Sequence, residues 1–226
     1  MALPLSLLQN AGLRRATELA QVHTASISSG YSSLDAQLPG GGWPSGGLTE
    51  ILFAHQGIGE LRLLGPALAS LSRRKRRLAW IAPPYLPYGP ALSAAGIDPA
   101  MLLIVRCTTS TEILWAAEQC LKSAACGAIL LWPQQLRYTE LRRLQLAAAD
   151  TTALTFLFRS TRMMQEASPA ALRLSLGAAS GGLFLRILKR RGMALPQPLF
   201  ISPAPPHAVD RPLLSPFRSL DAVLQL

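Results

Sequence analysis

Acidic residues, cysteines and histidines are scarce in this chain. Of its 226 residues, 12 are Asp or Glu, three are Cys and three are His. No cysteine belongs to a C-x-x-C pair or has a histidine at metal-ligand spacing, so we expect no metal site. Cys107, Cys120 and Cys126 form a sparse, odd set without a secretion signal, which favours reduced thiols acting as small apolar residues.

Long apolar runs are also missing, although 50% of the residues are apolar. The longest such stretch, AACGAILLW at residues 124–132, is well short of the roughly 18–20 residues of a membrane-spanning helix and fits a buried strand. The N-terminal MALPLSLLQNAGLRR lacks the basic residues that precede the apolar core of a signal peptide, and it lacks a clear cleavage site. We therefore expect a cytoplasmic protein without a membrane partner, long enough for one domain with a full core.

Positive charge, in contrast, is abundant and clustered. The 22 Lys and Arg residues give a formal net charge of +10, with clusters at Arg73 to Arg77, at Arg137, Arg142 and Arg143, and in RILKRRG from Arg186. Such clusters attract nucleic acid, anionic membranes or acidic proteins, or they complete helix ends and keep a surface soluble. For Arg73 to Arg77 both interpretations stand. The candidates for weak, non-specific DNA contact are Arg186, Lys189, Arg190 and Arg191, with solubilising charge on an outer strand as the alternative.

Strand and helix patterns alternate through the middle of the chain. Apolar runs predict strands at 49–53, 77–84, 101–107, 127–132 and 153–160, and helical periodicity predicts helices at 60–73, 89–96, 110–125 and 138–150, with Ser110 as an N-cap. Strands that are apolar on both faces and are followed by helices specify a parallel sheet covered on both sides. Period-two alternation around a Gly-rich turn predicts a β-hairpin within 170–192, and 198–203 is one more candidate strand.

Three regions are expected along the chain: an N-terminal helix and connector (1–26), a core domain (27–203) and a Pro-rich C-terminal tail with a short helix (204–226). The apolar residues of the tail are candidates for partner binding, and packing of the tail on its own core is an equal alternative. These candidates are Leu213, Leu214, Phe217, Leu220, Val223 and Leu224.

A Gly-rich loop lies between the strand at 49–53 and the helix at 60–73, as a phosphate-binding loop would. That loop requires G-x-x-x-x-G-K-[ST], in which amides cradle phosphates, Lys adds a positive charge and the hydroxyl holds Mg²⁺. Here FAHQGIGEL keeps Gly57 and Gly59 but has neither Lys nor Ser/Thr, and Glu60 sets a carboxylate against phosphate oxygens. We expect a degenerate loop retained as a turn, no cofactor and no catalytic residue. An atypical ATPase that uses amides and arginines is the remaining enzymatic alternative.

The segment before this loop, ISSGYSSLDAQLPGGGWPSGGLTEI (27–51), resembles the one that leads into the phosphate loop of RecA-type recombinases. The resemblance covers about residues 27–203 and implies an α/β, RecA-like core: a mostly parallel sheet flanked by helices and ending in a β-hairpin. In that family an Asp that holds Mg²⁺ and an activating Glu follow two of the strands. Trp132–Pro133 and Pro83–Pro84 stand there instead. The matching residues are Ile27, Ser28, Gly30, Leu34, Asp35, Leu38, Gly41, Gly42, Pro44, Gly46, Glu50 and Ile51.

A RecA-like core without ATPase parts resembles two families, ImuA and SulA, and the GIGELRLL loop with the long C-terminal extension favours ImuA. That resemblance implies a non-catalytic accessory protein of SOS-induced, error-prone translesion DNA synthesis. Its implied partners are an ImuB-like Y-family polymerase homologue, RecA and an error-prone replicative-type polymerase, with self-association through the N-terminal segment. The SulA alternative implies an inhibitor of FtsZ polymerisation and cell division.

Overall fold

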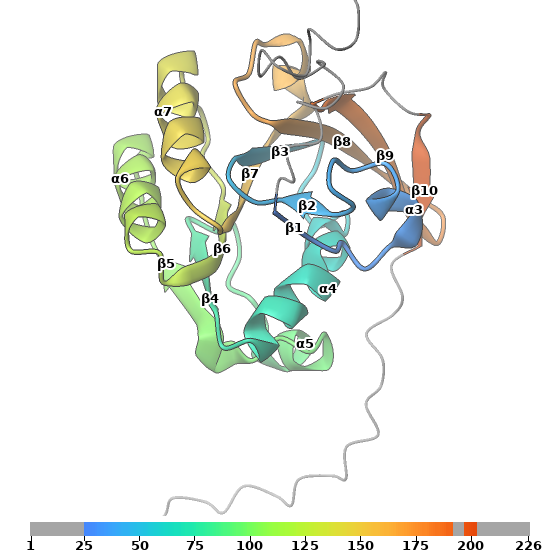
Figure 1. The fold of residues 1–226 in the computed structure, drawn as a ribbon, viewed down its shortest axis with the longest axis horizontal. Coiled ribbons are helices and arrows are strands. Elements are labelled where there is room, and N and C mark those ends of the chain that lie inside the picture. Colours follow the sequence, from blue (N-terminus) through green and yellow to red (C-terminus); the bar gives the residue numbers. More distant parts are fainter. Residues whose placement is uncertain (1–24, 192–196, 203–226) are drawn as a thin grey trace, which may run out of the picture.

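An eight-stranded mixed sheet organises the chain in the computed structural model, which describes residues 25–191 and 197–202 (Figure 1). The strand order is β10-β9-β8-β3-β7-β6-β4-β5. From β8 to β5 all neighbours are parallel, whereas β8, β9 and β10 pair antiparallel. The strands are β3 (Leu48–Phe53), β4 (Arg77–Ile81), β5 (Leu102–Val105), β6 (Cys126–Leu131), β7 (Leu154–Ser160), β8 (Leu172–Ala179), β9 (Gly182–Lys189) and β10 (Leu199–Ile201).

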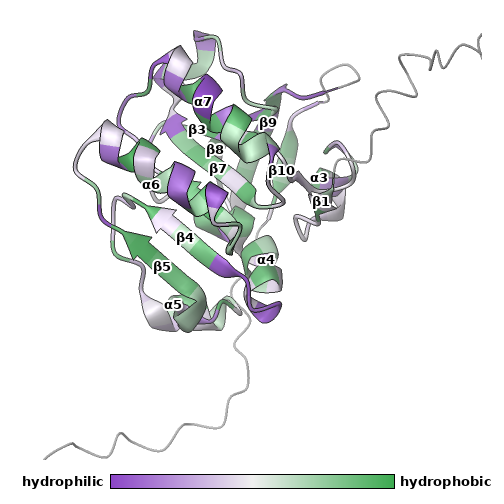
Figure 2. Cartoon of the chain, turned by 60° about the vertical axis from the view of Figure 1, so that its left-hand side comes forward, coloured by the Kyte–Doolittle hydropathy of each residue, from purple (hydrophilic) through white to green (hydrophobic). Residues whose placement is uncertain are grey.

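Helices cover the two faces of this sheet and create two hydrophobic cores. On one face, α4 (Glu60–Arg73) and α5 (Gly89–Ala94) pack together with the N-terminal part of the described chain, which includes Leu34 and Trp43. On the other face, α6 (Ser110–Lys122) and α7 (Tyr138–Ala149) lie side by side over the β4–β6–β7 part (Figure 1). Colouring by hydropathy shows apolar strands between amphipathic helices, as expected of a sheet buried on both sides (Figure 2). The prediction of an α/β fold with a mostly parallel sheet and a final hairpin is confirmed, and the arrangement is consistent with a RecA-like core.

The segment that carries the RecA resemblance folds as a small cap beside α4. Its strands β1 (Ser26–Ile27) and β2 (Trp43–Pro44) pair antiparallel around the short helix α3 (Ser32–Asp35). The Asp35 carboxylate accepts hydrogen bonds from the Ser28 hydroxyl at 2.6 Å and from the Ser29 amide at 2.8 Å. A side chain at Gly30 is excluded because its Cβ would lie 2.4 Å from Cβ of Pro66. Close packing on α4 therefore requires glycine at position 30 of this motif.

Pro66 lies inside α4, where proline removes a backbone hydrogen bond to the residue four positions earlier. The carbonyl left without that partner belongs to Arg62, and the Tyr31 hydroxyl donates to it at 3.1 Å. The cap thus supplies a hydrogen bond that the helix cannot make for itself, which fixes the cap to α4. Because Tyr31 is half-buried, desolvation raises the pKa of its hydroxyl, with the nearby Arg62 charge opposing the rise.

Several predicted elements are shorter in the structure, among them the helix predicted at 110–125, which ends at Lys122, and two differences have a clear local cause. The N-cap of α6 is Thr109 rather than Ser110: its hydroxyl accepts from the Glu112 amide, and the Glu112 carboxylate accepts from the Thr109 amide, which is a capping box. The strand expected at 77–84 ends at Ile81, because Ala82 takes a left-handed φ of 51° before Pro83 and turns the chain toward α5. Among the described residues no helix is both long and apolar enough to cross a membrane.

Candidate functional site

The loop at residues 54–59 connects the carboxyl end of β3 to the start of α4, the place where open parallel sheets bind ligands. Gly57 and Gly59 adopt φ of 79° and 113°, values that side chains disfavour. Gly59 is also the N-cap residue of α4. The turn and the helix start together present backbone amides in the manner of an anion-binding site.

The anion at these amides is the chain's own Glu60. Its two carboxylate oxygens accept hydrogen bonds from the Gly57 and Gly59 amides, each at 3.1 Å. Glu60 is 5% exposed and is the first residue of α4, where a negative charge is stabilised by the helix dipole. The carboxylate predicted to face phosphate oxygens instead occupies the amides that would bind them.

Aromatic rings fill the carboxyl ends of the neighbouring strands. Trp132, which follows β6, stacks on Phe158 of β7 with ring centroids 4.6 Å apart and planes at 22°. On either side of this stack, Phe53 lies 5.9 Å from Phe158, and Trp80 lies 5.8 Å from Trp132. Trp132 stands where the resemblance places a metal-holding aspartate, so this end of the sheet offers apolar surface in place of oxygen ligands. Among the described residues no group of three or more potential metal ligands comes together.

A buried ion-pair network crosses the centre of the sheet. Glu50 of β3 is fully buried and accepts from Nη1 of Arg159 on β7 at 2.9 Å and from Nε of Arg173 on β8 at 2.7 Å. Arg159 also pairs with Glu166 at 3.1 Å. Two arginines and two glutamates thus balance one another, with Glu166 at the exposed end of the network. Sequence reasoning missed this network, although Arg159 and Arg173 were visible as charges inside otherwise apolar strands.

This network also fixes the segment between β7 and β8. The Arg173 guanidinium donates to the backbone carbonyls of Met163, Met164 and Glu166 at 3.0, 3.4 and 3.1 Å. The segment forms a short 3-10 helix, Thr161–Gln165, over the end of the sheet. In this chain the segment is short and is held by a buried side chain.

Curated proteins named ImuA, from Caulobacter vibrioides strains NA1000/CB15N and ATCC 19089/CIP 103742/CB 15, are each 30% identical to this chain over 129 residues. The chain is distantly similar to ImuA. The match covers 55% of this chain and 53% of each relative, so the chain spans about half the length of the curated relatives it matches. No protein-family model matches the chain. The similarity agrees with the family resemblance of the loop and supports a distant relationship.

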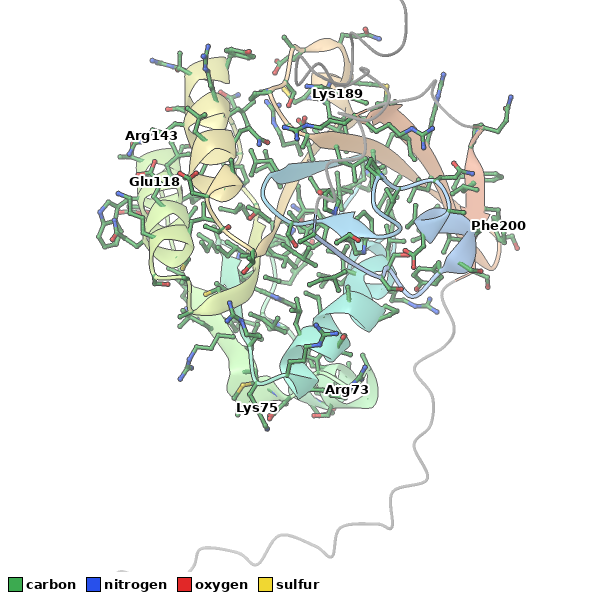
Figure 3. The ribbon with its side chains drawn as sticks, in the orientation of Figure 1. Arg73, Lys75, Glu118, Arg143, Lys189 and Phe200 are labelled. Carbon is green, nitrogen blue, oxygen red and sulfur yellow. The ribbon has the colours of Figure 1, made fainter. Side chains whose placement is uncertain are left out.

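Several residues of the first two basic clusters make contacts within the fold. Arg73 ends α4, and Lys75 takes a φ of 57° and pairs with Asp98 at 3.5 Å. Arg76 donates to the carbonyls of Ala124 and Cys126 at 3.0 and 3.1 Å, which ties two turns together. In the second cluster, Arg143 of α7 donates to Glu118 of α6 at 2.7 Å (Figure 3). Many of these charged side chains therefore stabilise helix ends or connect neighbouring elements.

The four candidate DNA-contacting residues divide into two kinds. Lys189 donates to the Ser168 carbonyl at 2.7 Å, and the Arg190 guanidinium donates to the Gln37 carbonyl, so both side chains make backbone contacts within the fold. Burial lowers the pKa of Lys189, and the nearby Arg173 charge lowers it further. Arg186 and Arg191 are exposed on the same hairpin. They are the members of the set best placed to meet a partner.

The thiols lie closer together than their spacing in the sequence suggested. Cys120 of α6 and Cys126 of β6 interact, and Cys126 is buried whereas Cys120 and Cys107 are half-buried. A hydrogen bond from the Cys120 thiol, followed by the Arg76 and Arg77 charges, lowers the pKa of Cys126 to about 7 against the opposing effect of burial. The same pairing raises the pKa of Cys120. The cysteines are free, as predicted, but they are not chemically equivalent.

A cleft of about 680 Å³ lies between α4, α5 and the cap. Its floor is largely apolar, and small residues such as Gly65, Ala69 and Ala91 widen it, while Arg62 and Arg73 line it beside the exposed Tyr88. This cleft could not be predicted from the sequence, because its residues come from four separate segments. The tail candidates Leu213, Leu214, Phe217, Leu220, Val223 and Leu224 and the N-terminal helix lie outside the described residues and stay predictions.

Proposed function

We propose that this chain is a non-catalytic accessory protein of damage-induced, error-prone translesion DNA synthesis. The observation that carries the proposal is the similarity to ImuA over 129 residues, joined to the segment at 27–51 that resembles RecA-type recombinases. In this role the RecA-like core is a scaffold. It brings together an ImuB-like Y-family polymerase homologue, RecA and an error-prone replicative-type polymerase, and it works through surfaces rather than through a reaction centre.

Loss of the ATP site belongs to the same proposal, and the position of Glu60 supports it. A nucleotide phosphate at this loop would have to displace a carboxylate that already accepts from the Gly57 and Gly59 amides. It would also lack the lysine and the hydroxyl of the motif, because Glu60 and Leu61 occupy those positions. Phosphoryl transfer requires positioned cations, and Trp132 adds none.

Nucleotide binding is the first test. The full chain is titrated with a fluorescent ATP analogue and Mg²⁺, and ATP hydrolysis is measured with and without single-stranded DNA. We expect neither saturable binding nor turnover. Micromolar binding would contradict the proposed role of Glu60 and would require the chain to be treated as a nucleotide-dependent motor or switch.

Partner binding is the second test, because it separates the two candidate roles. The full chain is mixed in turn with the Y-family homologue, RecA, the error-prone polymerase and FtsZ, and complexes are measured by calorimetry. We expect binding to at least one of the first three and no effect on FtsZ polymerisation. Inhibition of FtsZ assembly without binding to the replication proteins would replace the proposal with the SulA-like alternative.

The tail offers a matched pair of variants for that experiment. If the apolar tail residues carry partner binding, Phe217→Ser with Leu220→Ser weakens the complex at least tenfold, since buried apolar anchors dominate such interfaces. The control changes two polar residues of the same tail, Ser215→Ala with Ser219→Ala, and we expect it to bind like the wild type. Equal binding by both variants would assign the contact to another surface.

A further inference from the structure

Two phenylalanines form an exposed pair on the final strands. Phe184 of β9 and Phe200 of β10 lie directly opposite each other in the register. Their rings are 5.7 Å apart at an angle of 68°, and the residues are 55% and 49% exposed. Figure 3 places Phe200 at the outer edge of the molecule. Large aromatic side chains left together at a surface commonly mark a binding site.

The pair stands on the side of the hairpin that faces away from its core. Strand alternation turns Leu183, Leu185 and Ile187 into the core and Phe184 outward. The helices α6 and α7 lie over the other half of the sheet and leave this part uncovered (Figure 1). A Cβ added to Gly177, the β8 residue opposite Phe184, would meet no described atom within 4 Å. Among the described residues, the rings therefore border sheet surface that is open at Gly177.

Positive charge accompanies the rings on the same face. Arg186 follows Phe184 by two residues on β9, so both side chains leave the strand on one side, and Arg186 lies opposite Ser175 of β8. No residue of β8, β9 or β10 is acidic, and the exposed Arg191 follows β9. This surface combines aromatic faces, a neighbouring guanidinium and no opposing carboxylate on its strands.

We propose that this platform, defined as Phe184, Phe200 and Arg186, binds single-stranded nucleic acid. Bases stack on the two rings without regard to sequence, and the guanidinium contacts the phosphate between them. A duplex fits poorly because its bases are already stacked and paired. The inference deepens the proposed function by naming a ligand of this surface, and it rests on that function only for its biological setting.

The test measures fluorescence anisotropy of a labelled oligothymidine of about 20 nucleotides, and of a duplex of equal length, with the purified full chain. We expect the single strand to bind more tightly than the duplex. Phe184→Ala and Phe200→Ala should each weaken binding about 5- to 150-fold, the effect of losing about 1–3 kcal/mol of stacking per base. Arg186→Ala should reduce the slope of log affinity against log salt by about 0.7.

Two controls separate stacking from folding. Phe184→Tyr retains an aromatic face and should bind like the wild type, whereas loss of binding in this variant would contradict stacking. Trp115→Ala removes an exposed aromatic residue, 63% exposed on α6, outside the platform and should leave binding unchanged. Thermal melting of all variants confirms that each is folded before its affinity is compared.

Three results would overturn the proposal. The first is wild-type affinity for the single strand in both Phe→Ala variants, and the second is tighter binding of the duplex than of the single strand. The third is a concentration-dependent oligomer that the Phe→Ala changes abolish without altering DNA binding. The last result would assign the rings to contact between copies of this chain. Because partner binding is measured without DNA, failure here and failure of the accessory role are distinguishable.

Discussion

Replacing Glu50 by glutamine should destabilise the protein far more than the loss of any single surface charge. The wild-type carboxylate gives one oxygen to Arg159 at 2.9 Å and the other to Arg173 at 2.7 Å, and the three side chains are 0%, 4% and 9% exposed. Glutamine has one oxygen only, so its NH₂ group must face one of the two guanidinium donors. Two buried positive charges also lose the carboxylate that lies between them.

Breaking a buried ion pair by removing one partner costs about 3–5 kcal/mol. A typical protein is stable by about 5–15 kcal/mol, so Glu50→Gln consumes a large fraction of that margin. For a chain of this size the melting temperature should fall by roughly 6–20 °C, at about 2–4 °C per kcal/mol. Urea unfolding, followed by circular dichroism, gives the free-energy difference directly, and the m-value shows whether the folded state stays compact.

The matched control is Asp98→Asn, which removes the exposed pair with Lys75. These side chains are 42% and 74% exposed, and the asparagine oxygen still accepts from the Ala100 amide as Asp98 does. We expect a loss of about 0–1 kcal/mol. The free energies of unfolding of Glu50→Gln and of this control could instead differ by less than about 1 kcal/mol. That result would mean that water reaches the network or that the arginines find new partners, and it would refute the argument for a buried, balanced cluster.

Three further predictions concern the loop, the cap and the thiols. Glu60→Ala leaves the Gly57 and Gly59 amides without their acceptor, and we expect a loss of about 1–3 kcal/mol in urea unfolding; an unchanged midpoint would show that water replaces the carboxylate equally well. Gly30→Ala should be more destabilising than Gly41→Ala by about 1–3 kcal/mol, since both have positive φ but only at Gly30 does the added Cβ clash, with Pro66. Equal losses would mean that backbone strain alone decides. For Cys126 the folded pKa of about 7 lies below its ordinary value of 9.0, so wild-type stability should rise between pH 7 and 9 relative to a Cys126→Ala variant, whereas parallel curves at pH 6 and 8.5 would contradict the lowered pKa.

The sequence predicted local features better than contacts between distant segments. Strand β3 and helix α4 agree with their predicted ranges to within one residue, because hydrophobic periodicity and the flanking glycines are local signals. The mixed sheet followed from strands apolar on both faces and from the period-two pattern around Gly181. The position of the Glu60 carboxylate at the loop was predicted. Its hydrogen bonds to two loop amides were not, because they depend on a backbone geometry that the residue types alone do not determine.

Contacts between distant segments could not be foreseen in this way. Arg159 and Arg173 are 109 and 123 residues from Glu50 in the chain, and only the order β7-β3-β8 brings them together. The Phe184–Phe200 pair depends in the same way on the β9–β10 register. Strand alternation alone predicts that each ring points outward, but it does not predict which residue lies opposite. The capping box at Thr109 was available in the sequence as T-x-x-E, and the choice of Ser110 overlooked the glutamate three residues after Thr109.

Because Glu60 is part of the chain, its contact with the loop amides does not depend on the concentration of a ligand. A ligand that binds and dissociates stabilises a loop more strongly as its concentration rises, so the stability of the fold depends on the supply of that ligand. An acceptor attached to the next residue has an effective concentration fixed by the backbone, and it does not rise or fall with metabolism. In the structure the Gly57 and Gly59 amides therefore have an acceptor that belongs to the chain itself. If the ATP site is lost as we propose, the loop gives this chain no means of responding to the supply of nucleotide.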